Sequence, residues 1–148
     1  MQYIIYIHIL AATAWIGGTL LLFALGIFLR DKEAQNSVYK HLGPLYGYFE
    51  SVWLAVLLAT GTLLYMHHGF GEVFTSAVDS ELAETMTRKI YTVAAITLFT
   101  LIHMYIAFKT HASTRTKLEN IISRGSSMMI FFLNLIILWY ATQLRSML

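Results

Sequence analysis

The sequence contains no cysteine, only one proline and few charged residues. Without cysteine the chain has no disulfide, no thiolate metal site and no iron–sulfur cluster. Charged side chains make up 12% of the residues, about half of the share that soluble domains carry, whereas hydrophobic residues reach 57%. The net charge of +2 is too small to indicate binding to nucleic acid. This composition indicates a membrane protein that is embedded in the lipid bilayer.

Four apolar segments are long enough to cross a bilayer as helices, which takes about 20 residues each. We expect these spans at about 3–29, 45–66, 90–108 and 126–142. The predicted fold is all-α, a transmembrane four-helix bundle that forms a single domain over residues 1–148. Gly43 and Pro44 predict a break just before the second span. The first apolar run is too long for a signal peptide and lacks a basic start, so we expect it to be a helix of the mature protein.

Lysine and arginine are unevenly distributed between the loops. The loops after the first and third spans hold seven of them: Arg30, Lys32, Lys40, Lys109, Arg115, Lys117 and Arg124. The other side holds three: Arg88, Lys89 and Arg145. The positive-inside rule then predicts that both termini and the loop 67–89 lie on the outer side of a bacterial inner membrane. The stretch TSAVDSELAETM in that loop is predicted to form a short amphipathic helix or a lid at the surface.

The first span carries an unexpected imidazole in an apolar helix. Helical spacing places His8 and Trp15 on one stripe that faces the bundle, with Gly18 at its border. His8 is either a structural hydrogen-bonding group or a ligand to haem or metal. Trp15 lies too deep for an interfacial belt, so we interpret it as packing or as the wall of a cofactor site.

The other spans also carry polar residues on the faces expected to point inward. In the second span Glu50, Gly61 and His68 align, whereas His67 points about 100° away. The polar face of the third span holds Lys89, Thr92, Thr100 and His103. The polar face of the fourth span holds Ser127 and Asn134. Depth along the helices predicts an outer group of His8, His68 and Lys89. It also predicts an inner pair of Glu50 and His103, which either fixes the helix register or has a proton or ligand role.

The stretch HILAATAWIGGTLLLF resembles the first span of the CopD/HemJ class of small four-span bacterial membrane proteins. Lys89 at the start of the third span and His103 near its end are similar to residues of HemJ-type protoporphyrinogen oxidases, and Arg124 before the fourth span is similar as well. The segment after the first span, FALGIFLRDKE, lacks the proline that HemJ members have there. The resemblance implies a haem-b-binding redox protein that passes electrons to a quinone or a respiratory-chain partner.

A haem in a four-helix bundle needs an inward-facing imidazole and small residues that make room for it. His8 is the predicted first ligand and His68 or His67 the second, with space provided by Gly18 and Gly61. Lys89 and Arg88 are predicted to pair with the propionates or with an anionic porphyrin substrate.

Two other functions stay open on the sequence alone. One is a non-catalytic accessory subunit of a respiratory membrane complex, in which the histidines are structural. The other is a CopD-like copper protein with His8, Met66, His67 and His68 as ligands, since copper accepts imidazole and thioether groups. An oligomer is compatible with all three functions.

Overall fold

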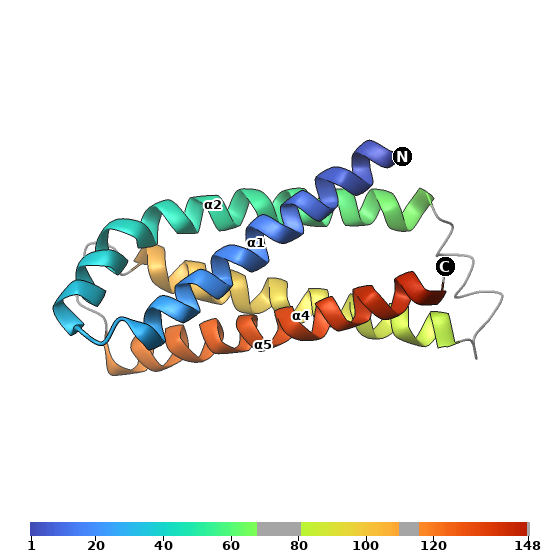
Figure 1. Ribbon diagram of the computed structural model, residues 1–148. Helices are drawn as coiled ribbons and strands as arrows, with labels where there is room; N and C mark the ends of the chain where they lie inside the picture. Colours follow the sequence, from blue (N-terminus) through green and yellow to red (C-terminus); the bar gives the residue numbers. More distant parts are fainter. Residues whose placement is uncertain (68–80, 110–115, 148) are drawn as a thin grey trace.

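The computed structural model describes residues 1–67, 81–109 and 116–147. Within these ranges the chain forms α1 (Gln2–Phe28), α2 (Lys32–His67), α4 (Glu81–Lys109) and α5 (Lys117–Met147), and no strand. All four helices are long and apolar enough to cross a membrane. The predicted all-α bundle is therefore confirmed, and the chain is a multi-pass membrane protein (Figure 1).

Three helices, α2, α4 and α5, extend beyond the predicted spans; α5 begins at Lys117 and ends at Met147, whereas the predicted span is 126–142. Helix α2 begins at Lys32 and continues through Gly43 and Pro44, so the predicted break is wrong. Proline removes one backbone donor, and a helix accommodates this loss by bending; the first turns of α2 curve away from the rest of the helix (Figure 1). Helix α4 begins at Glu81 and takes in the second half of TSAVDSELAETM. The first half of that stretch lies outside the described residues.

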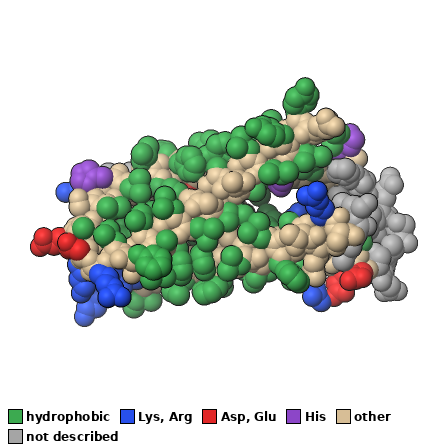
Figure 2. All heavy atoms as spheres, in the orientation of Figure 1, with side chains coloured by type: hydrophobic (Ala, Val, Ile, Leu, Met, Phe, Trp, Pro, Cys, Tyr) green, Lys and Arg blue, Asp and Glu red, His purple; other side chains and the backbone are tan. Residues whose placement is uncertain are grey.

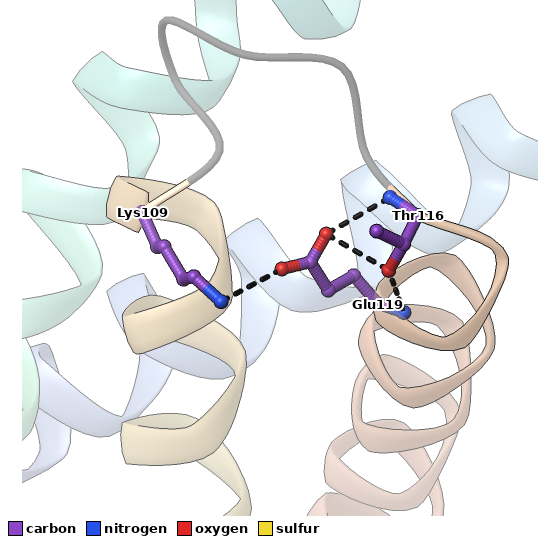
Figure 3. Close-up of polar contacts among 3 residues, drawn as sticks. All are labelled: Lys109, Thr116 and Glu119. Carbon is purple, nitrogen blue, oxygen red and sulfur yellow. Dashed lines mark hydrogen bonds and ion pairs between the residues drawn. The ribbon is translucent and has the colours of Figure 1, made fainter.

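Side chains cap the starts of α2 and α5. The Asp31 carboxylate accepts a hydrogen bond from the Glu33 amide at 2.9 Å. At α5, the Glu119 carboxylate accepts from the Thr116 amide at 2.9 Å, and the Thr116 hydroxyl accepts from the Glu119 amide at 3.2 Å (Figure 3). This reciprocal arrangement is a capping box, which the sequence pattern Thr-x-x-Glu encodes. Lys109 at the end of α4 pairs with the same carboxylate at 3.0 Å, so one acidic group joins both helix ends.

The helices associate as two pairs. Helix α1 packs mainly on α2 and α4 mainly on α5, while narrower seams join α1 to α5 and α2 to α4. Helices α1 and α4 lie diagonally and make no close backbone contact in the described residues. The two chain termini lie at the same end of the bundle, together with the end of α2 and the start of α4 (Figure 1). We call this end the terminal end.

The core lies where the two pairs meet. Its buried members are Trp15, Ile16, Leu54, Ile96 and Ile130, one or two from each helix. Near this cluster the rings of Phe23 and Phe131 stack with centroids 3.9 Å apart, which closes the α1/α5 seam. Many other large apolar side chains are exposed, and Figure 2 shows that they cover the middle of the molecule while charged groups gather at its ends. This distribution fits lipid around the middle and water at both ends.

Candidate functional site

The imidazole of His8 is held by a hydroxyl on the neighbouring helix. Its Nδ1 atom lies 2.8 Å from Thr60 Oγ1 across the α1/α2 interface. The Thr60 hydroxyl proton is already donated to the Val56 carbonyl, at 2.6 Å. Because a hydroxyl has only one proton to donate, Thr60 Oγ1 must accept from His8. In the neutral ring the proton therefore resides on Nδ1, which leaves the Nε2 lone pair for a ligand role.

Gly61 makes room for this ring. A Cβ atom at position 61 would lie 3.3 Å from His8 Cε1 and 3.9 Å from His8 Nδ1. The imidazole therefore rests directly on the backbone of α2. The sequence predicts that Gly61 makes space for a haem, whereas in the structure the His8 ring occupies the space beside Gly61.

Lys89 on α4 is a cationic group near His8. It is half-buried, and its charge acts on the His8 ring from α4. In the described part of the chain the Lys89 ammonium has no hydrogen bond and no ion pair. Figure 2 shows an opening between the two helix pairs toward the terminal end, with Lys or Arg and His side chains at its edge. The structure thus brings together two members of the predicted outer group, His8 and Lys89.

The other predicted ligands are placed differently. His68 lies outside the described residues, so the structure does not test its position. His67 and Met66 are exposed at the end of α2, and Met66 has 71% of its surface accessible. Among the described residues no group of three or more His, Asp or Glu side chains is arranged to hold a metal ion.

Arg88 lies on a different face from Lys89. It is exposed and forms an ion pair with Glu84, one turn earlier on α4. The Arg88 side chain also lines an open groove on the outside of the α4/α5 pair, together with Leu135, Ile136, Trp139, Tyr140 and Gln143. Arg88 and Lys89 are both predicted to pair with the propionates or with an anionic porphyrin. In the structure they lie on different faces of α4, Arg88 at the groove and Lys89 toward the bundle interior.

Trp15 and Gly18 lie in closely packed surroundings. Trp15 is 3% exposed and belongs to the core. A Cβ atom at position 18 would lie 2.6 Å from Tyr46 Cε2, so the Tyr46 ring covers this glycine. The Tyr46 hydroxyl also lies 3.4 Å from Thr19 Oγ1. Gly18 thus accommodates a tyrosine from α2, a residue that the sequence patterns did not single out.

Glu50 and His103 lie at the same level of the bundle. The neighbouring Ser51 hydroxyl donates to Met104 Sδ at 3.4 Å, which fixes the register of α2 against α4. Glu50 is buried, with 5% of its surface exposed. His103, however, is directed to α5, where its Nδ1 lies 3.1 Å from the Ser123 carbonyl. In the described part of the chain, Glu50 and His103 share no hydrogen bond or ion pair.

The inward face of α5 is shifted relative to the prediction. Ser127 is exposed, whereas Ser126 is buried and its hydroxyl lies 3.3 Å from His103 Nδ1. Asn134 is buried as predicted, with 1% of its surface exposed. Sequence patterns did not predict the contact of Ser126 with His103 or that of Thr60 with His8. A hydroxyl in an apolar helix usually bonds its own backbone and gives no distinct signal.

No family model, no curated protein and no solved structure matches the chain. The resemblance to the CopD/HemJ class therefore stays a prediction from the quoted residues.

Proposed function

We propose that the chain is a haem-b-binding redox protein of a bacterial inner membrane, similar to HemJ-type protoporphyrinogen oxidases, in which His8 would hold the haem iron. The observation that carries this proposal is the bond between His8 Nδ1 and Thr60 Oγ1, whose direction is set by the Thr60–Val56 bond. Ligating histidines commonly donate their other ring nitrogen to an acceptor, which fixes the tautomer and the ring orientation.

The residues around His8 fit such a group. Gly61 lets the imidazole lie against α2, and Figure 2 shows an opening between the two helix pairs toward the terminal end. The Lys89 ammonium, which has no ion pair among the described residues, is suited to balance a propionate, because an intramembrane charge requires a counter-charge. When bound, haem b supplies one-electron transfer. The chain orients the ligand and neutralises the anionic edge of the porphyrin.

The second ligand, the substrate and the electron acceptor belong to the same proposal. His68, the next residue in the sequence after α2, is the proposed second ligand. By the distribution of Lys and Arg, the terminal end faces the periplasm. The oxidation of protoporphyrinogen and the transfer of electrons to a quinone rest on the resemblance alone. The Lys89 charge is compatible with an anionic porphyrin as substrate.

An optical spectrum of the purified protein tests the cofactor. After expression in haem-replete cells, we expect a Soret band and a b-type difference spectrum between the oxidised and the dithionite-reduced protein. Titration of the detergent-solubilised apoprotein with haemin should restore the band at one haem per chain. A protein that shows no Soret band and takes up no haemin would contradict the proposal.

A further inference from the structure

Three polar groups lie buried in the middle of the bundle with no hydrogen-bond partner among the described residues. They are the indole N–H of Trp15, the hydroxyl of Thr100 and both amide atoms of Asn134. Their exposed fractions are 3%, 0% and 1%. In a bilayer such groups have no access to bulk water, so each must find a partner inside the protein.

One of the three groups belongs to the core cluster, and the other two lie one helical turn from its members. Trp15 belongs to the cluster that contains Ile96 and Ile130. Thr100 lies one helical turn from Ile96 on α4, and Asn134 lies one turn from Ile130 on α5. The groups therefore come from three different helices, α1, α4 and α5, and lie around the same cluster.

Thr100 differs from most other threonines in the described helices. The usual arrangement is a hydroxyl that donates to the carbonyl four residues earlier, as in Thr13, Thr19, Thr60, Thr62, Thr87, Thr92 and Thr97. The Thr100 hydroxyl makes no such bond. The Thr100 hydroxyl is therefore not engaged by its own helix and can bind a separate polar molecule.

The chemistry of the groups suits water. The indole supplies one donor, the amide supplies two donors and an acceptor, and the hydroxyl can donate and accept. A buried water commonly makes about three hydrogen bonds to polar groups that are otherwise unsatisfied. Together the three side chains offer at least this number of donors and acceptors, from three different helices.

We propose that Trp15, Thr100 and Asn134 form a binding site for internal water at the centre of the bundle, shared by α1, α4 and α5. The site goes beyond the haem proposal and does not depend on it. It also lies close to the level of Glu50, because Thr100 is one turn from Met104, which contacts Ser51. The bound water would then place a mobile hydrogen-bonding group near the level of the buried Glu50 carboxyl.

Replacing Asn134 by leucine gives opposite results with and without the water. If water is bound, Asn134→Leu removes one anchor and leaves Trp15 and Thr100 unsatisfied, so the melting temperature falls. If Asn134 is a buried polar group with no partner at all, leucine removes the free-energy cost of burying an unsatisfied amide, and the melting temperature rises. Thr142→Val, an exposed change on the same helix, is the control and should have little effect.

A spectroscopic measurement separates bound water from a simple packing defect. In protein with ¹⁵N-labelled tryptophan, the Trp15 indole signal is assigned by its loss in Trp15→Phe. We expect a cross-peak between this indole proton and water in the native protein. The cross-peak should disappear in Asn134→Leu, while the Trp53 and Trp139 signals stay in place. A Trp15 indole without a water cross-peak in the native protein overturns the proposal.

Discussion

The ring of His8 occupies the space that a side chain at position 61 would fill. Its Cε1 atom lies 3.3 Å from the place of a Cβ atom on Gly61, and its Nδ1 atom lies 2.8 Å from Thr60 Oγ1. Two consecutive residues of α2 therefore determine the position and the tautomer of one imidazole on α1. The first two predictions follow from this contact.

Adding a methyl group at position 61 should displace the imidazole. In Gly61→Ala the new Cβ must push the His8 ring by a few tenths of an ångström, which weakens the bond to Thr60. We expect a lower haem content per chain, measured from the Soret absorbance of protein purified under identical conditions. Gly43→Ala is the control on the same helix, since no atom lies within 4 Å of that Cβ position. Equal haem content in both variants would argue against the contact.

Removing the Thr60 hydroxyl should weaken cofactor binding without displacing the ring by steric pressure. Loss of such an outer partner of a ligating histidine typically costs about 10–100-fold in affinity. We therefore expect Thr60→Val to bind haemin more weakly by about this factor in a titration of the apoprotein. Thr62→Val is the matched control, because the exposed Thr62 hydroxyl bonds only the Leu58 carbonyl, at 2.8 Å. If both variants titrate like the native protein, Thr60 does not orient the ligand.

The adjacent glycines of the first span should respond differently to alanine. Gly18→Ala would place a Cβ 2.6 Å from the Tyr46 ring, whereas a Cβ at Gly17 meets nothing within 4 Å. Overpacking of this kind costs about 1–3 kcal/mol. The free energy of unfolding in mixed micelles should fall by this amount for Gly18→Ala and stay level or rise for Gly17→Ala. A similar loss in both would show that the helix, and not the Tyr46 contact, requires glycine.

The junction of α4 and α5 allows a comparison of a cap with an ion pair. Thr116→Ala removes an N-cap hydroxyl that bonds the Glu119 amide and should cost about 1 kcal/mol. Lys109→Met removes a pair whose lysine side chain is 57% exposed, so a smaller loss is expected, because solvent screens exposed ion pairs. Chemical denaturation of both variants measures the difference. A larger loss for Lys109→Met would reverse this ranking.

The sequence predicted the helices better than it predicted their polar contacts. Apolar runs located all four spans, because the bilayer requires a minimum length of apolar helix. The continuation of α2 through Pro44 was missed, since local turn signals do not show that a long helix can bend around one lost donor. Helical spacing correctly predicted that Asn134 is buried but chose Ser127 in place of Ser126, one position along α5.

Contacts between helices depend on their rotation and register, which periodicity leaves open. Spacing placed Glu50 and His103 at one depth, and the Ser51–Met104 contact places them at one level. It did not show that His103 is directed to Ser123 on α5. The packing of Tyr46 against Gly18 could not be predicted for the same reason, because a glycine in a sequence does not reveal which side chain covers it.

The most direct test of the central claim is the spectrum of His8→Ala beside that of His67→Ala. Both variants remove an imidazole, but only His8 is held inside the bundle, by Thr60. We predict that His8→Ala loses the b-type Soret band, while His67→Ala keeps it, with both proteins folded and purified in equal yield. A full Soret band in His8→Ala, at unchanged haem content, would contradict the assignment of His8 as the residue that holds the haem iron.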